Sequence, residues 1–133
     1  MLGVDTNVLV RFLAEDDATQ TPQAVALVLR AANQPIFVAQ VVAVEAFWVL
    51  TKIRKFPVPS VVETYRQLFS NASFEIENRR IMVQALDDCL LAGCDFADAV
   101  IALVNARAGC ATTATIDHDA QTLPGMTAVE ALL

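Results

Sequence analysis

The sequence predicts an α/β fold in which a parallel sheet of about five strands carries helices on both of its faces. Short apolar runs alternate with segments that have apolar residues at helical spacing, which is typical of parallel sheets. No two runs are joined by a two-residue turn of the kind that closes a β-hairpin. The 133 residues, 56% of them hydrophobic, are enough for one domain over residues 1–133 with a substantial core.

The first part of the chain contains two predicted strands. Leu2–Asp5 is an apolar run that ends in an acid, and Ile36–Val38 is a second short run. Between and after them, the spacing predicts helices over residues 8–13, from the Thr21-Pro22 start signal to about Ala32, and from about Val41 to Lys55.

The second part follows a rigid connector, Phe56–Pro59, which ends the preceding helix. A capping-box pattern that begins at Ser60 predicts a helix with apolar residues as far as Phe69. The later predicted elements are a strand over Ser73–Ile76, a helix from Ile81 to Leu90 that stops at Gly93, a helix from Phe96 to Ala108, a strand from Ala111 to Ile116, a turn or short helix from Asp117 to Thr122, and an edge strand from Met126.

The charge balance bears on the class of partner. A net charge of −6, from 9 basic and 15 acidic residues, argues against a protein that holds nucleic acid by counterion release alone. An acidic protein can still act on a phosphate polymer if bound cations neutralise part of its charge. The high apolar content, with a mean hydropathy of +0.49, predicts an apolar surface patch for a second subunit or a partner chain.

Cysteine usage and hydropathy restrict the class further. The cysteines are odd in number and lack the spacing of a zinc site, so we expect small buried thiols at Cys89, Cys94 and Cys110. The longest apolar tract, Ile36–Leu50, is interrupted by two polar residues and is shorter than the roughly 20 residues of a membrane span. Without a signal-peptide pattern before residue 5, a cytoplasmic protein is expected.

Four acids lie at predicted element ends or inside an apolar helix: Asp5, Glu45, Asp98 and Asp117. Asp5 ends the first strand, and we expect Thr6 or Asn7 to cap the helix that follows. Glu45 has apolar neighbours on nearly every face of its helix, and burying an unpaired carboxylate costs several kcal/mol. Its position therefore favours a cation ligand.

Each acid also has a structural explanation that involves no ligand. Asp5 can be a turn residue at a strand end, and Asp117 can cap the turn that follows it. Asp98 can lie in the first turn of a helix capped by Asp95, where the helix dipole favours its charge. Glu45 can form a single salt bridge or lie on a narrow exposed strip.

If the four acids meet in space, they predict a divalent-cation site. Carboxylates brought together raise one another's pKa unless cations intervene, and Mg²⁺ or Mn²⁺ favours oxygen ligands. One or two such ions can orient a phosphodiester, activate water and stabilise the departing oxygen. Thr6, Asn7 and Thr115 would then support the ligands as neutral hydrogen-bonding groups.

Other polar residues near these acids have weaker patterns. Asp119 is expected to be exposed, with a role as a substitute ligand as the alternative, and His118 is expected to be solvated. Lys52, Arg54 and Lys55 form a basic cluster near the end of the helix that carries Glu45. The cluster either stabilises the helix C-terminus or, together with Arg11, steers a polyanion towards the acids.

Four motifs resemble those of the PIN-domain ribonucleases and, within them, the VapC toxins of bacterial toxin–antitoxin pairs. They are Val4–Leu9, Val44–Leu50, Asp95–Ala102, and Thr115–Asp117 followed by Leu123–Gly125. They occur in the expected order and span nearly the whole chain. The resemblance implies a single PIN-like domain and a Mg²⁺- or Mn²⁺-dependent endoribonuclease whose metal site is lined by Asp5, Glu45, Asp98 and Asp117, supported by Thr6, Asn7 and Thr115.

The resemblance also implies partners. Members act on RNA and usually form homodimers, and a cognate antitoxin inserts a segment that blocks the site, often with a basic side chain. One departure is Gln40, because many members carry a small hydroxyl residue five positions before the glutamate. The departure puts helix capping at that position in question.

Two other classes compete with this interpretation. A non-catalytic binding module would use the acids for a structural cation or for a basic partner peptide. A phosphoacceptor domain of the receiver type also gathers acids at the ends of parallel strands, but it needs a lysine late in the chain. No lysine follows Lys55, which disfavours the receiver class.

Overall fold

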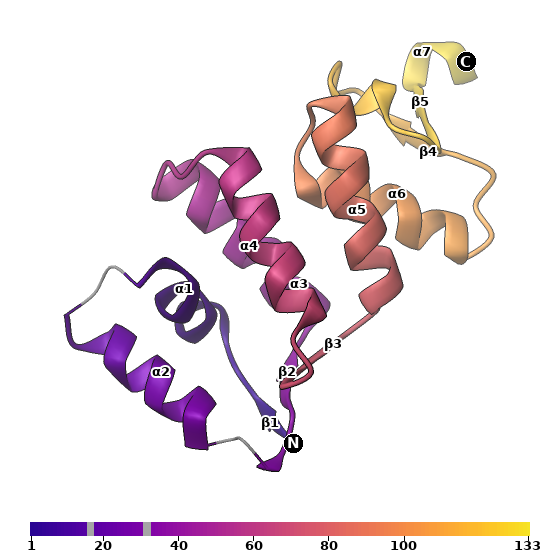
Figure 1. Cartoon of the computed structure of the whole chain (residues 1–133). Helices are drawn as coiled ribbons and strands as arrows, with labels where there is room; N and C mark the ends of the chain where they lie inside the picture. The colour runs from indigo at the N-terminus through magenta and orange to yellow at the C-terminus, as the bar shows by residue number, and fades with distance from the viewer. Residues whose placement is uncertain (16–17, 31–32) are drawn as a thin grey trace. The chain divides into compact units, whose positions relative to one another are not determined.

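The computed structural model describes residues 1–15, 18–30 and 33–133 (Figure 1). The chain divides into two compact units, residues 1–79 and 80–133, and each is described by itself. Parallel strands alternate with helices, which confirms the predicted α/β fold. The five described strands are divided between a sheet of three in the first unit and a sheet of two in the second. The organisation of residues 1–133 as a single domain stays a prediction.

The sheet of the first unit has the order β1-β2-β3. Its strands are β1 (Leu2–Gly3), β2 (Ile36–Val38) and β3 (Phe74–Ile76), and Ile36 lies opposite both Leu2 and Phe74 in the parallel register. The first and third residues of β2 and of β3 are buried, as the alternation of a pleated strand requires. β1 is two residues shorter than the predicted Leu2–Asp5 strand.

The helices of the first unit are α1 (Thr6–Ala14), α2 (Gln20–Arg30), α3 (Gln40–Trp48) and α4 (Val58–Ser70). They correspond to the predicted helices, and the expected end at Ala32 lies outside the described residues. α4 begins before Ser60, with Pro57 at its N-cap and Pro59 in its first turn, so the predicted capping box at Ser60 is wrong. Proline suits this turn because its missing N–H would have no helical partner there.

The predicted continuous helix to Lys55 is also wrong. After α3 the chain forms a π-helical turn, Val49–Ile53, in which the N–H of Arg54 donates to the Val49 carbonyl at 2.9 Å. Lys55 then adopts a left-handed conformation with a φ of 62°. A π-helical turn rotates the side chains that follow it relative to a continuous α-helix, so the basic cluster does not lie on an ordinary helix end.

Tyr65 of α4 is at the centre of the first unit's core. Its ring is fully buried, with ring centroids 5.2 Å from Phe47 and 5.5 Å from Phe69 in edge-on arrangements. Its hydroxyl donates to the Ala43 carbonyl of α3 at 2.7 Å. The same burial raises the pKa of the phenol well above its usual value, so the hydroxyl stays protonated and remains a donor.

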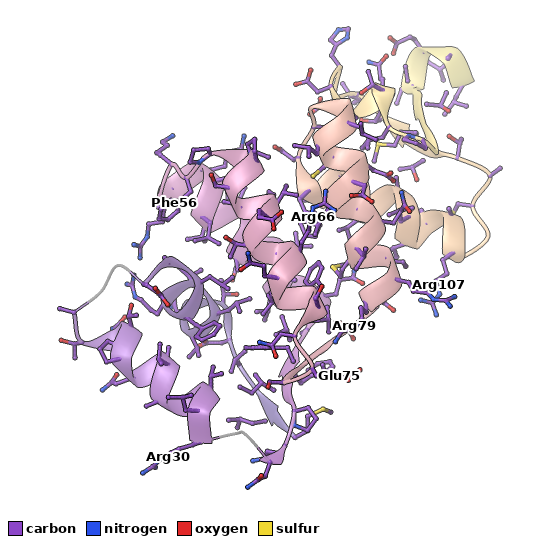
Figure 2. The ribbon with its side chains drawn as sticks, in the orientation of Figure 1. Arg30, Phe56, Arg66, Glu75, Arg79 and Arg107 are labelled. Carbon is purple, nitrogen blue, oxygen red and sulfur yellow. The ribbon has the colours of Figure 1, made fainter. Side chains whose placement is uncertain are left out.

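Arg79, which is labelled in Figure 2, fixes the beginning of β3 to the C-terminal end of α4. The Arg79 guanidinium donates to the Phe74 carbonyl at 2.5 Å and also to the Phe69 carbonyl. One guanidinium can satisfy both carbonyls because its donors form a planar fork. This contact ties the C-terminal end of α4 to the beginning of β3.

The second unit consists of two long helices and a small parallel sheet. α5 (Arg79–Ala92), whose first residue belongs to the first unit, buries one face, and α6 (Phe96–Arg107) buries Phe96, Ala99 and Val100. Gly93 has a φ of 68°, a conformation that favours glycine and lets the chain turn after α5. The remaining elements are β4 (Thr113–Thr115), a 3₁₀ turn at Ala120–Thr122, β5 (Met126–Ala128) and α7 (Val129–Leu132), with Thr113 opposite Met126.

Several large apolar side chains are exposed in both units. Among the helices that the structure describes, none is long and apolar enough to cross a membrane. The apolar excess of the sequence appears in this structure as large apolar side chains exposed on helices and loops. Examples are Val41, Trp48, Ile53, Leu91, Ile101 and Ile116.

We predict that Tyr65→Phe lowers the free energy of unfolding by about 1–3 kcal/mol, since the Ala43 carbonyl loses a buried donor while the ring packing remains. Chemical denaturation monitored by circular dichroism measures this change. The control is Ser70→Ala on the same helix, which removes an exposed hydroxyl bonded to its own helix and should cost about 0.5 kcal/mol or less. Equal costs for the two variants would contradict the role assigned to Tyr65.

Candidate functional site

Asp5 connects β1 to α1. Its backbone is extended, with φ −89° and ψ 177°, and its Oδ1 accepts a hydrogen bond from the Val8 N–H at 3.0 Å. Asp5 is therefore the N-cap of α1, and the expectation that Thr6 or Asn7 caps this helix is wrong, because Thr6 is already the first helical residue. A carboxylate that caps through one oxygen has a second oxygen for a cation, so the two roles are compatible.

Glu45 lies on the exposed face of α3. The buried face of this helix carries Ala43, Ala46 and Phe47, whereas Glu45 shares the exposed face with Val41 and Trp48, which are 72% and 52% exposed. The expectation that apolar neighbours bury Glu45 is wrong, since this helix leaves apolar side chains in solvent. A hydrated carboxylate needs no partner, so the burial argument for a cation ligand at Glu45 no longer holds.

Asp98 lies in the first turn of α6 and is half-buried. Burial raises the pKa of its carboxyl group, and the negative charges of Asp95 and Asp117 raise it further. A helix dipole acting alone would lower this pKa, so burial and repulsion outweigh it. Asp95 occupies the N-cap position of α6, but its side chain makes no capping bond. The explanation in which Asp95 caps the helix through its side chain is therefore not supported, although Asp98 does lie in the first turn.

Asp117 follows β4 and is held by the backbone on both sides. Its Oδ1 accepts hydrogen bonds from the N–H groups of Asp119 and Ala120 at 2.8 Å and 3.2 Å, which caps the 3₁₀ turn. Its own N–H donates to the Thr115 hydroxyl at 3.1 Å. Thr115 thus positions Asp117, while any role towards a metal stays a prediction. His118 and Asp119 are exposed, as expected.

Asp95, Asp98 and Asp117 form the acidic group of the second unit. Its field also reaches Cys94, whose thiol pKa is raised to about 12, first by burial and then by the charges of Cys89, Asp98 and Asp95. An unrelieved negative potential of this kind is what a bound cation relieves, and the donors are all carboxylate oxygens. The chemistry of the group fits Mg²⁺ or Mn²⁺.

The structure leaves the convergence of the four predicted ligands as a prediction. Asp5 and Glu45 belong to residues 1–79, and Asp98 and Asp117 belong to residues 80–133. Within the described ranges, no set of three or more histidine, cysteine, aspartate or glutamate side chains is arranged to hold a metal ion.

Sequence reasoning missed Glu77. Its carboxylate accepts a hydrogen bond from the Gln40 N–H at 2.8 Å, at the first residue of α3. The Gln40 side chain in turn accepts from the Asn78 amide at 2.6 Å. Capping that a small hydroxyl residue would supply locally thus comes from the segment after β3. The signal is the strand order, because β2 and β3 are neighbours and their carboxyl ends meet.

The basic residues occupy varied environments. Lys52 and Lys55 are exposed and Arg54 is half-buried, all within or just after the π-helical turn. Arg11 in the last turn of α1 donates from Nε to the Gln20 side chain at 2.7 Å, which fixes its guanidinium near the start of α2.

Among the other predicted residues, Thr6 is half-buried and Asn7 is exposed at the start of α1. The expectation of buried thiols is confirmed for Cys89, whereas Cys94 is half-buried and Cys110 is exposed, so the expectation is wrong for Cys110.

A comparison with models of protein families identifies the family of this chain. The family model described as PIN domain matches residues 3–125, a range that contains all four predicted acids and takes in parts of both units. No curated protein matches the chain in sequence. PIN domains are in general metal-dependent nucleases, and the match covers far more than half of the chain. The chain therefore belongs to the PIN-domain family.

Proposed function

We propose that this protein is a Mg²⁺- or Mn²⁺-dependent endoribonuclease that hydrolyses RNA phosphodiesters. The observation that carries the proposal is the PIN-domain match over residues 3–125, a range that includes the four predicted ligands Asp5, Glu45, Asp98 and Asp117. The acidic group around Asp98 supports it, because burial and two neighbouring carboxylates raise the pKa of Asp98, and a bound cation would favour its ionised form.

The residues have distinct tasks in this proposal. A divalent cation, when bound, supplies the Lewis acidity that phosphodiester hydrolysis by water requires. Asp5 and Asp117 would hold one or two such ions with carboxylates already oriented by capping bonds to backbone N–H groups. Asp98 would contribute a carboxylate whose ionised form is disfavoured until a cation binds. Glu45 would contribute an exposed carboxylate that can turn towards the cation.

We further propose that the enzyme is a VapC-type toxin of the cytoplasm that forms a homodimer and is neutralised by a cognate antitoxin. The exposed apolar side chains support an association surface, because large apolar groups on a helix face gain from burial against a partner. The acidic group supports an antitoxin that presents a basic side chain to the site. A non-catalytic module that binds a cation or a basic peptide is the alternative.

Asp5→Asn should reduce RNA cleavage in Mn²⁺ by roughly a hundredfold or more, since the variant loses the charge that binds the cation. Asparagine is as good an N-cap as aspartate, so α1 and the fold should be preserved. Cleavage of a fluorescent RNA measures the effect, with EDTA as a second way to remove activity. Glu63→Gln, on the exposed side of α4, is the matched control and should cleave like the wild type.

Two results would contradict this assignment. Cleavage that persists in EDTA or in Asp5→Asn would show a metal-independent reaction or a contaminating nuclease. Tight binding of a basic peptide by a wild-type protein that cuts no RNA in either metal would establish the non-catalytic alternative.

Mn²⁺ should raise the thermal stability of the wild type, by about 2.7 kcal/mol at a free-ion concentration one hundred times Kd. Asp98→Asn should gain clearly less. Without divalent ions, Asp98→Asn should be more stable than the wild type. The pKa of Asp98 is raised in the folded state, so its ionised form destabilises the fold above that pKa, and asparagine removes this charge. Differential scanning fluorimetry at pH 7 with and without Mn²⁺ measures both effects.

The Glu63→Gln control should show the full Mn²⁺ shift. If Asp98→Asn gains as much stability from Mn²⁺ as the wild type, Asp98 is not a ligand, whatever the cleavage assays show.

Lys52→Ala combined with Lys55→Ala should raise KM for RNA and weaken its dependence on salt, because fewer cations are left to attract the polyanion. The chemical step at saturating RNA should change little. Steady-state kinetics between low and moderate salt measure both parameters. Arg30→Ala with Arg80→Ala removes the same charge from other exposed positions and is the control. If both double variants raise KM equally, the effect comes from net charge alone, and the basic cluster has no special role in attracting RNA.

A further inference from the structure

A cavity of about 380 Å³ lies between α1 and α2, and its lining includes Asp5. On the α1 side it is formed by Asp5, Val8 and Arg11, which follow one another at helical spacing. On the α2 side the lining residues are Gln20, Gln23, Ala24 and Leu27, which form one face of that helix. All of them belong to residues 1–79, so the cavity depends on one unit only.

Two hydrogen bonds join α1 and α2 at one end of this cavity. Arg11 donates from Nε to the Gln20 side-chain carbonyl at 2.7 Å. The buried hydroxyl of Thr21 donates to the Arg11 backbone carbonyl at 3.1 Å. These two bonds join the last turn of α1 to the first turn of α2. Contacts within the protein therefore hold the two helices together at this end of the cavity, which lowers the cost of ordering its walls around a ligand.

The lining has the chemistry of a site for a flat, uncharged, polar ring. Val8, Ala24 and Leu27 supply apolar surface, and the amides of Gln23 and Asn7 supply donors and acceptors. The single carboxylate of Asp5 and the single guanidinium of Arg11 give the lining no net charge. A phosphate would favour a surplus of positive charge, whereas a nucleobase has apolar faces and a hydrogen-bonding edge.

We propose that this cavity binds a base of the RNA substrate next to the bond that is cut, so that Gln23 and its neighbours set base preference. The inference rests on the proposed ribonuclease function, in which Asp5 helps to hold the scissile phosphate through a cation. Arg11 lies six residues beyond Asp5, roughly 9 Å along the helix axis. The cavity thus extends away from the carboxylate over a span that a ribose and its base can occupy.

Single-stranded RNA can present a base in this way because its bases are readily unstacked and turned outwards. Amide side chains read the edge of such a base through a paired donor and acceptor. Gln23 is the residue to test, since it is exposed at the cavity while the Gln20 carbonyl is engaged with Arg11.

The experiment is sequencing of the cleavage ends of a randomised single-stranded RNA cut in Mn²⁺. The wild type should prefer one base at a position adjacent to the cut. Gln23→Leu should weaken that preference by roughly fivefold to a hundredfold, the range expected for a lost pair of base contacts. Gln23→Met, which is closer in shape, guards against a folding defect and should have the same effect. The control is Gln67→Leu, on the exposed face of α4, which should keep the wild-type preference.

The outcomes separate this inference from the function on which it rests. Wild-type cleavage with a base preference that neither Gln23 variant changes would overturn the inference and leave the ribonuclease intact. An equal loss of preference in Gln67→Leu would overturn it as well. A wild type that cuts no RNA in Mg²⁺ or Mn²⁺ would overturn the proposed function, and the inference with it.

Discussion

Carboxylates that accept hydrogen bonds from backbone N–H groups fix the starts of three helical segments in this protein. Asp5 caps α1, Glu77 caps α3 and Asp117 caps the 3₁₀ turn after β4. Each bond satisfies an N–H that a helix leaves without an internal partner, and each places a negative charge where the helix dipole favours it. The bonds therefore orient the acids before any ligand arrives, which is what precise cation binding requires.

The second unit shows the cost of gathering such acids. The pKa of Asp98 is raised by burial and by two neighbouring carboxylates, so its ionised form is disfavoured in the fold. Asp98 is not the N-cap of α6, since Asp95 occupies that position, so capping does not account for an acid here. A destabilising charge that no capping or packing role explains is characteristic of functional sites. The argument for a cation is therefore stronger at Asp98 than at the exposed Glu45.

Much of the fold could be predicted from the sequence, because apolar spacing and glycine or proline signals are local. Features that depend on other segments could not. The apolar neighbours of Glu45 predict that it is buried, but which face of α3 is covered depends on the elements that pack against the helix. The Glu77 cap required the order of β2 and β3, and the π-helical turn after Trp48 has no clear sequence signal. Asp5, Asp98 and Asp117 are predicted from their positions at the ends or starts of elements, and their role as ligands stays a prediction.

α1 connects the two halves of the proposed chemistry. Its N-cap is the carboxylate assigned to the cation, and its last turn carries the Arg11 that binds α2 at the far side of the cavity. A helix of nine residues is short enough to behave as one rigid piece, so a shift at either end moves the other. Base recognition in the cavity and placement of the phosphate at Asp5 are then geometrically coupled. A base that fits poorly would displace the phosphate from the cation, so that specificity would be expressed in the rate of cleavage as well as in binding.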